Sequence, residues 1–343
     1  MIHVLIILIS VLLSSSAWAT AYYVTKSGSN ANDGLSAGTA FLTIQKAADT
    51  VVAGDTVYVR AGTYNEIVTI VKAGTSGLPI AFYQYPGDAR PIIDGNGFAN
   101  TLDSVGIGSP SAYVTFSGFE VYRTPRHGII VYDAHHITVT NNLVHDGPRN
   151  GVYLYNTSSS TVSYNTIYRM ILAGNSDCIA ASDGSVNNII HHNAVARCSD
   201  DGIDTWTTTG NTVENNTSCL NGYDLNGIPA GDGNGFKLGS GGGNSVKNNI
   251  ACNNLAKGFS ANGGPNNMLS NNIAWGNGSV SYEAGLILVQ KNLTVDPLIL
   301  SLDPASSNFL TIAASSPAVN AGIVTPYTTN DGCGVDIGAF ELP

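Results

Sequence analysis

The chain has 343 residues, of which 39 are glycine and only 11% are charged, and its formal net charge is −10. Abundant glycine with few charges is typical of a domain with many buried strands and tight turns. The negative charge argues against nucleic acid or an anionic membrane as a partner. It does not exclude an anionic polymer, because calcium ions or local arginines can bridge two negative surfaces.

Residues 1–19 have the pattern of a signal peptide. An apolar run extends from Val4 to Leu13, and Ala17-Trp18-Ala19 supplies an A-x-A cleavage site. The run is too short to span a bilayer. We therefore predict a mature chain that begins at Thr20, is secreted to the extracellular space or the periplasm, and has no membrane partner.

Residues 20–65 are expected to form an N-terminal cap and a first coil. The segment from Thr43 to Val51 has apolar residues at helical spacing, and a turn at Gly54-Asp55 leads into the strand-like Val57-Tyr58-Val59. An amphipathic helix at this place would cover the open end of a repetitive core. Without such a cap, the end would expose unpaired strand edges.

Between residues 66 and 285 a unit of 23 residues recurs. The steps between its repeated asparagines are 23, 28, 23, 33 and 23 residues, so the insertions are 5 and 10 residues long. Short β-branched stretches separated by turn residues fill each unit, which predicts an all-β fold, a parallel β-helix of about 23 residues per coil. A ladder of side-chain amides inside one turn is expected. The asparagines are Asn142, Asn165, Asn193, Asn216, Asn249 and Asn272.

The repeat sets which residues lie side by side, because equivalent positions in neighbouring coils are about 4.8 Å apart. Once the insertions are removed from the count, the tenth position after the repeated asparagine is a predicted inward column: Val152, Ile179, Ile203, Phe236 and Phe259. Side chains alternate along a strand, so the eleventh position faces outward. The outward column is Tyr153, Ala180, Asp204, Lys237 and Ser260. Lys237 is therefore expected beside Asp204.

Four aspartates from two neighbouring coils are predicted to converge near this lysine: Asp177, Asp200, Asp201 and Asp204. Carboxylates held this close repel one another unless a cation neutralises them. An all-oxygen set suits Ca²⁺, which takes about 6–8 oxygen ligands. A solvated acidic face is the alternative interpretation of the same residues.

Lys237 is the candidate general base. Burial and a nearby bound cation both disfavour a charged amine, so they are expected to lower its pKa into a useful range. A purely structural ion pair between Lys237 and Asp204 is the other interpretation.

Several residues are candidates for binding an anionic polysaccharide. Arg126 and Arg149 are 23 residues apart, so we expect them to stack, and a row of arginines can bind carboxylates bidentately. Each of them could equally be a surface residue that packs its stem. The full set of candidates is Arg126, Arg149, Arg197, Trp206 as a sugar-stacking face, and Lys257.

The five cysteines are Cys178, Cys198, Cys219, Cys252 and Cys333. An odd count leaves at least one free if the others pair. Cys219 and Cys252 occupy equivalent positions one coil apart, where either a disulfide or two packed thiols would fit. The sequence has no zinc-type cysteine and histidine spacing and no G-x-S-x-G nucleophile motif.

Three stretches carry a family resemblance: residues 199–206 (SDDGIDTW), 231–239 (GDGNGFKLG) and 256–259 (AKGF). They resemble the core motifs of family 9 polysaccharide lyases, the pectate lyases with a right-handed parallel β-helix, and the likeness covers roughly residues 110–285. It implies that Asp177, Asp200, Asp201 and Asp204 bind Ca²⁺. It also implies that Lys237 abstracts the C5 proton of a galacturonate, so that de-esterified pectin is cleaved by elimination.

Three alternatives stay open. The substrate could be another uronic-acid polymer. A glycoside hydrolase could use Asp200 and Asp201 as acid and base, although this reaction gives Lys237 no role. A non-catalytic carbohydrate-binding β-helix is the third reading, because fold does not dictate function.

Beyond about Tyr282 the 23-residue period fades. We predict that residues 286–343 form loops and short strands that cap the far end. The expectation for residues 20–343 is therefore a single elongated β-helix domain, and we expect it to be a monomer.

Overall fold

The computed structural model describes residues 19–171, 174–328 and 334–342. The predicted signal peptide, apart from Ala19, and the fifth cysteine, Cys333, lie outside the described residues. Among the described residues, no helix is both long and apolar enough to cross a membrane.

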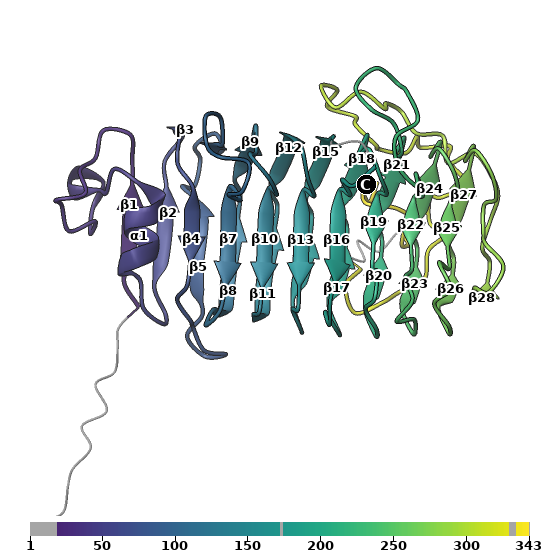
Figure 1. The fold of residues 1–343 in the computed structure, drawn as a ribbon, viewed down its shortest axis with the longest axis horizontal. Helices are drawn as coiled ribbons and strands as arrows, with labels where there is room; N and C mark the ends of the chain where they lie inside the picture. The colour runs from purple at the N-terminus through teal and green to yellow at the C-terminus, as the bar shows by residue number, and fades with distance from the viewer. Residues whose placement is uncertain (1–18, 172–173, 329–333, 343) are drawn as a thin grey trace, which may run out of the picture.

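The chain winds into the predicted parallel β-helix, and its strands form three parallel sheets that run the length of the molecule (Figure 1). The eight-stranded sheet consists of β4 (Val68–Ile70), β7 (Val105–Gly108), β10 (Ile129–Tyr132), β13 (Val152–Tyr155), β16 (Ile179–Ser182), β19 (Ile203–Asp204), β22 (Phe236–Lys237) and β25 (Phe259–Ser260).

The eleven-stranded sheet follows it along each complete coil. Its strands are β1 (Ala21–Val24), β2 (Thr56–Val59), β5 (Ile80–Gln84), β8 (Ala112–Ser117), β11 (His135–Thr140), β14 (Thr161–Ser163), β17 (Ile189–His191), β20 (Thr212–Glu214), β23 (Ser245–Lys247), β26 (Met268–Ser270) and β28 (Ile287–Gln290).

The nine-stranded sheet completes the coil. Its strands are β3 (Gly62–Tyr64), β6 (Pro91–Asp94), β9 (Glu120–Tyr122), β12 (Leu143–Gly147), β15 (Thr166–Met170), β18 (Ala194–Ala196), β21 (Thr217–Cys219), β24 (Ile250–Cys252) and β27 (Ile273–Trp275).

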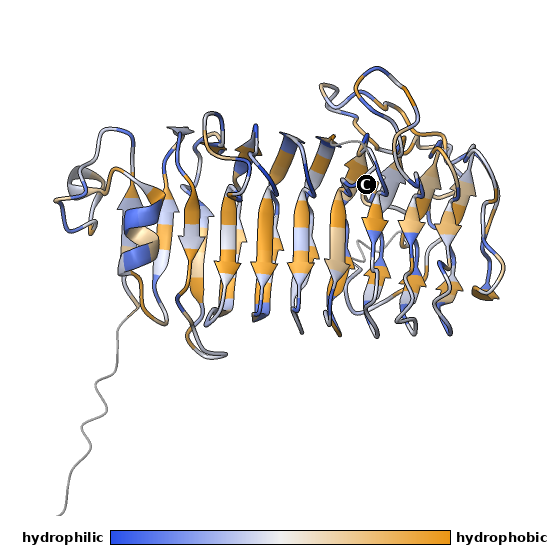
Figure 2. Cartoon of the chain, in the orientation of Figure 1, coloured by the Kyte–Doolittle hydropathy of each residue, from blue (hydrophilic) through white to orange (hydrophobic). Residues whose placement is uncertain are grey.

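Apolar columns fill the inside of the solenoid, and Figure 2 shows the hydrophobic residues as orange segments that recur on successive strands. The predicted inward column is confirmed, because its members pair strand by strand and are fully buried: Val152, Ile179, Ile203, Phe236 and Phe259. The rings of Phe236 and Phe259 stack with their centroids 4.7 Å apart. Burying each such side chain stabilises the fold by about 1.5–3 kcal/mol.

The predicted asparagine ladder is present between the eleven-stranded and nine-stranded sheets. The backbone N–H of Asn193 donates to Oδ1 of Asn216 at 3.0 Å, and the N–H of Asn216 donates to Asn249 at 2.9 Å. The residue before each ladder asparagine adopts a positive φ; for example, φ is 51° at Asn215. The buried amides therefore hold a turn that non-glycine residues adopt at a cost.

Two further ladders occupy the other two corners of the coil. One precedes the eleven-stranded sheet and contains Asn188, Asn211, Asn244 and Asn267. The other follows the nine-stranded sheet and contains Asn221, Asn254 and Asn277. Neighbouring coils are thus joined by side-chain amides at every corner in this part of the solenoid.

The N-terminal cap is the expected helix, α1 (Ile44–Thr50), which follows a 3-10 turn at Ala37–Thr39. Ile44 and Ala47 are buried against the first coil. The carboxylate of Glu66 accepts the backbone N–H groups of Ile44 and Gln45 at 2.9 Å each, so a residue from the first coil satisfies donors that the helix start leaves free.

The C-terminal segment lies along the side of the solenoid, not over its far end as the sequence suggested. Phe309, Ile312 and Ile337 pack against small or apolar outward residues of the nine-stranded sheet, such as Ala196 and Ile250. The reason is that this outer face is itself apolar and needs cover. The far end itself is left uncovered at the last strand, β28, because all four residues of this strand are exposed.

Two disulfides are formed among the described residues. Cys219 and Cys252 lie on adjacent strands β21 and β24 with their Cα atoms 4.6 Å apart, so of the two sequence-based interpretations the disulfide is the one observed. A second disulfide joins Cys178 to Cys198, with a Cα separation of 5.5 Å, and the sequence analysis did not identify it.

Replacing one ladder amide tests its contribution to stability. In Asn216→Ala the buried N–H of Asn193 loses its acceptor, and an orphaned donor plus the lost amide bonds should lower the free energy of unfolding by about 3 kcal/mol. Chemical denaturation measures this. The exposed Asn308→Ala should change it by less than about 0.5 kcal/mol; an equal effect in both variants would contradict the role given to the ladder.

Candidate active site

Two of the aspartates belong to a fourth column, just before the eight-stranded sheet. The backbone N–H of Asp177 donates to Asn150 Oδ1 at 3.1 Å, and the N–H of Asp201 donates to Asp177 Oδ1 at 3.0 Å. The N–H of Asn234 then donates to Asp201 Oδ1 at 2.7 Å. Carboxylates thus occupy two steps of a column whose other members carry amides. The hydrogen bonds fix both acids, and Asp201 is fully buried.

Three carboxylates converge in this region. One oxygen each from Asp177, Asp200 and Asp201 lies within 4.8 Å of the others. Asp200 Oδ1 is held by the backbone N–H of Asp232 at 2.6 Å. Asp201 Oδ2 is buried and, apart from the Lys237 ammonium 3.2 Å away, has no polar partner among the described residues. We call these three residues the acidic group.

Asp204 lies beside the acidic group but is not one of the three that converge. It pairs with Lys237 in the register of β19 and β22, as predicted. Its Oδ2 is 3.5 Å from Lys237 Nζ, whereas its Oδ1 is buried and accepts no hydrogen bond. A buried carboxylate oxygen without a donor is costly, so this oxygen is suited to a ligand.

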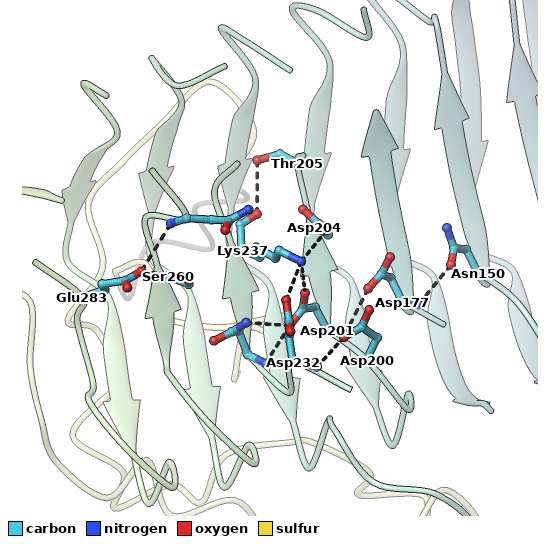
Figure 3. Close-up of polar contacts among 12 residues, drawn as sticks. Asn150, Asp177, Asp200, Asp201, Asp204, Thr205, Asp232, Lys237, Ser260 and Glu283 are labelled. Carbon is cyan, nitrogen blue, oxygen red and sulfur yellow. Dashed lines mark hydrogen bonds and ion pairs between the residues drawn. The ribbon is translucent and has the colours of Figure 1, made fainter. Parts of the chain in front are cut away.

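The amine of Lys237 points into the cluster of carboxylates (Figure 3). Its Nζ lies 3.2 Å from Asp201 Oδ2 and 2.8 Å from Asp232 Oδ2, and its side chain is 14% exposed. The structure therefore brings together the lysine and all four aspartates that the sequence singled out. Their roles remain predictions.

The electrostatics of the acids favour a bound cation. Burial raises the pKa of Asp177 and of Asp204 well above the ordinary value, and the neighbouring carboxylates raise it further. Burial also raises the pKa of Asp201 to about 6, although the Lys237 ammonium opposes this shift. Clustered, partly unsatisfied carboxylate oxygens of this kind fit Ca²⁺, a hard cation with all-oxygen ligation.

The pKa of Lys237 differs from the sequence-based expectation. Burial lowers the pKa of the amine, as expected. The charges of Asp204, Asp201 and Asp232 outweigh burial, so without a bound cation the pKa is raised. The expectation counted the cation and the desolvation but not the number of carboxylates in direct contact with the amine. Neutralising those carboxylates would reverse the dominant effect.

A hollow of about 480 Å³ opens above the acids on the outer face of the eight-stranded sheet. Arg149 and Trp206 both line it, and Trp206 is half exposed. At its N-terminal side the rings of His127 and Tyr153 lie 4.9 Å apart. Its other lining residues are Asn150, Gly174, Asn175, Asp177, Ala180, Ala181, Ser182, Asp183, Asp200, Asp204, Asp232 and Lys237.

Arg126 and Lys257, two further binding candidates, are each engaged by an acid. Arg126 forms a two-point ion pair with Asp103, with contacts of 2.6 and 2.8 Å, and lines a neighbouring hollow. Lys257 Nζ contacts Glu283. Neither residue lines the hollow above the acidic group.

Arg197 lies in a different region altogether. Its guanidinium donates to the carbonyl of Leu302 at 3.3 Å, and it lines a separate hollow together with Arg169 and Tyr223. This corner of the coil faces the C-terminal segment, which the repeat could not place. The structure thus separates Arg197 from the acidic group.

Asp232 is the site residue that the sequence analysis missed. It lies in the ten-residue insertion before β22, contacts Lys237 through its side chain, and contacts Asp200 through its backbone N–H. A register argument cannot place residues inside an insertion. The sequence feature that could have identified Asp232 is its position between two glycines, just before the repeat pattern starts again.

Comparisons with known proteins agree with this architecture. A family described as "Pel9A-like, right handed beta helix region" matches residues 22–292. The solved structure of pectate lyase Pel9A superposes with a TM-score of 0.75 at 23% identity, covering 94% of this chain and 96% of that chain.

More distant structures share the fold. A rhamnogalacturonan lyase has a TM-score of 0.57 at 20% identity, covering 86% of this chain and 97% of its own. An alginate lyase from Paenibacillus sp. str. FPU-7 has a TM-score of 0.57 at 19% identity, and the match covers 71% of this chain and 96% of the lyase chain. The uncharacterized protein YwoF of Bacillus subtilis (strain 168) is 37% identical over 78 residues, which are 23% of this chain and 16% of that protein.

Removing one buried charge should stabilise the protein in the absence of divalent cations. The folded-state pKa of Asp177 is raised. Protonated Asp177 therefore favours the folded state at low pH, and this contribution to stability is lost as the pH rises through the folded-state pKa. Asp177→Asn keeps an amide oxygen for the N–H of Asp201, as Asn150 does one coil earlier. With chelator present, the thermal midpoint of the variant should exceed that of the wild type at pH 8. The difference should shrink at pH 4; a difference independent of pH would contradict the assignment.

Proposed function

The chain belongs to the family of Pel9A-like right-handed β-helix proteins, and on this premise we propose that it is a secreted, calcium-dependent polysaccharide lyase that cleaves polygalacturonate by β-elimination. One observation carries the proposal. The amine of Lys237 lies within 3.5 Å of three carboxylates, beside the acidic group and in an open hollow. A base next to a cation site is the arrangement that elimination from a uronate requires.

Asp177, Asp200 and Asp201 would hold Ca²⁺, with Asp204 as a fourth ligand. The charge of Asp204 is the largest of the neighbouring charges that raise the pKa of Asp177, so the two acids interact strongly. When bound, Ca²⁺ would neutralise these carboxylates and withdraw electrons from the carboxylate of the substrate, which acidifies the adjacent C5 proton. The hydrogen bonds of the column keep the acids in place, so the chain supplies a preformed set of ligands.

Lys237, as the free amine, takes the C5 proton of the uronate. The electron pair of the C5–H bond becomes the C4–C5 double bond, the C4–O4 bond breaks with its electron pair staying on O4, and the leaving oxygen takes a proton from water. Asp201, Asp204 and Asp232 orient the amine through their contacts with Nζ. The same carboxylates stabilise the protonated form of the amine, so the reaction should be faster at alkaline pH, where more of the amine is free.

Arg149 and Trp206 are the binding residues that the geometry favours, because both line the same hollow as Lys237. Arg149 is suited to a substrate carboxylate. Trp206 offers a half-exposed ring to a sugar face. Arg126 and Lys257 would have to exchange their acidic partners for substrate, so we assign them at most contacts with distant sugar units.

Secretion is part of the proposal. The two disulfides among the described residues fit an oxidising compartment, and the N-terminal sequence has the pattern of a signal peptide. A polymer substrate outside the cell is consistent with both.

The hydrolase alternative fits the geometry poorly. A hydrolytic acid and base must both reach the glycosidic bond, but Asp201 is fully buried and bonded to the column. Lys237 would have no part in that reaction.

Removal of the base tests the mechanism. Polygalacturonate with Ca²⁺ should give an unsaturated product that absorbs in the ultraviolet, and Lys237→Ala should lower the rate at least about 100-fold, the low end for general-base catalysis. Chelator should abolish the signal, and Lys72→Ala, a lysine outside the cluster, should retain it. Saturated reducing ends without absorbance would instead indicate hydrolysis.

The same assay with alginate, rhamnogalacturonan and glycosaminoglycans identifies the polymer. A larger kcat/KM on one of these than on polygalacturonate would overturn the choice of substrate but not the mechanism. Binding without turnover of any of them, with Ca²⁺ at alkaline pH, would support the non-catalytic reading.

The pH profile tests the contact between Lys237 and Asp232. The Asp232 carboxylate is one of the charges that raise the pKa of the amine, and the rate rises with pH as the free amine forms. Asp232→Asn should therefore move the rising limb of the kcat profile to lower pH. Asp224→Asn, in the same insertion, should leave the limb in place. An unchanged limb in Asp232→Asn would mean that this carboxylate does not influence the base.

A further inference from the structure

A cluster of tyrosines covers the outer face of the first coils on the eleven-stranded sheet. Tyr23, Tyr58 and Tyr83 occupy equivalent positions on β1, β2 and β5. Their ring centroids are 6.0 Å and 6.4 Å apart in succession. Tyr85 lies 6.3 Å from both Tyr23 and Tyr58. We call these four residues the tyrosine platform.

The platform is not a requirement of the fold. Side chains alternate along β2, so Val57 and Val59 fill the core while Tyr58 faces outward. The same column continues through later coils without an aromatic ladder, since its members there are Ser117, Thr140, Ser163, His191, Glu214, Lys247 and Ser270. The core packs equally well beneath these residues, so the tyrosines at the start of the column need another explanation.

A hollow of about 410 Å³ lies over the platform. Three of its tyrosines line the hollow, and Tyr83 is 36% exposed. The remaining lining residues are Gln84, Pro86, Gly87, Ser117, Gly118 and Asn141. The hollow reaches from β2 to the end of β11, about three strand spacings or roughly 14 Å, so it is suited to an elongated ligand.

The lining is uncharged, in contrast to the hollow above the acidic group. Two guanidinium groups adjoin the hollow, and both are engaged. That of Arg60 stacks on the Tyr85 ring at 4.4 Å and is neutralised by Asp88 at 2.6 Å, and that of Arg90 donates to the side-chain oxygen of Asn141 at 2.9 Å. An anionic sugar would find no free cation among the lining residues and would lose hydration without compensation. Tyrosine rings with amide and hydroxyl groups at the rim match an uncharged sugar, whose C–H faces are apolar and whose edges carry hydroxyls.

We propose that the tyrosine platform is a binding site for an uncharged polysaccharide chain, separate from the acidic hollow. The two sites lie on different sheets, the platform on the eleven-stranded sheet and the acidic group on the eight-stranded sheet. One protein could then hold a neutral polymer on one face and act on an acidic polymer on another. The inference stands independently of the reaction proposed for Lys237.

Affinity electrophoresis tests the proposal. All variants carry Lys237→Ala, so that the protein does not degrade the polygalacturonate that serves as a control ligand. Soluble xylan, galactan and hydroxyethyl cellulose in the gel are the probes, and at least one of them should retard the protein. Replacing Tyr58 and Tyr83 together by serine should weaken that retardation about 10-fold, because each aromatic contact contributes a factor of a few. Replacing both by phenylalanine should keep most of it.

Controls separate this site from the acidic hollow and from misfolding. Tyr164→Ser removes an exposed tyrosine outside the platform and should not change the retardation. The platform variant should bind polygalacturonate with Ca²⁺ as its parent does, and should keep the thermal midpoint of its parent. If none of the neutral probes retards the protein, or if the serine variant is retarded as strongly as its parent, the proposal is wrong.

A second measurement needs no variant. Nitration of Tyr83 by tetranitromethane, followed by mass spectrometry, should slow several-fold in the presence of the retarding polysaccharide, whereas nitration of Tyr164 should not. Equal nitration of Tyr83 with and without that polysaccharide would also overturn the proposal.

Discussion

Hydrogen bonds from backbone N–H groups to buried side-chain amides of the neighbouring coil hold this solenoid in register. They recur at all three corners of the coil, where the chain must leave one sheet and enter the next. Corners place backbone donors inside the protein, where an unpaired N–H is costly. Because an amide from the next coil satisfies each donor, successive coils cannot slip relative to one another. The alignment of Asp204 with Lys237 depends on this restraint.

Much of the fold could be predicted because the repeat is explicit in the sequence. A fixed spacing of asparagines identified the coil, and alternation within strands separated inward from outward columns. The ladders at Asn211 and Asn254 show the same spacings of 33 and 23 residues as the one that was recognised. A prediction that follows a single register of asparagines does not reveal them, because they lie at other positions within the same coil. The C-terminal segment has no repeat, so its docking along the nine-stranded sheet could not be inferred.

The candidate site was predictable to the extent that it lies on the repeat. Register placed the aspartates and Lys237 together, but it gives positions along the backbone and not the directions of long side chains. Arg126 turns to Asp103, and Arg197 reaches the carbonyl of Leu302, a contact across 105 residues of sequence. Asp232 lies in an insertion, outside any column. The carboxylates of Asp204 and Asp201 raise the pKa of Lys237 most, and the carboxylate of Asp232 raises it further.

The column that runs from Asn150 through Asp177 and Asp201 to Asn234 has an implication for how such a site can originate. Aspartate and asparagine are nearly identical in shape, and both accept the same backbone hydrogen bond. Exchanging amides for acids at two successive steps therefore adds charge to a framework without displacing its backbone. In this column a structural position and a position with a carboxylate ligand differ by a single functional group, so point substitutions could add or remove the two acids without rebuilding the coil.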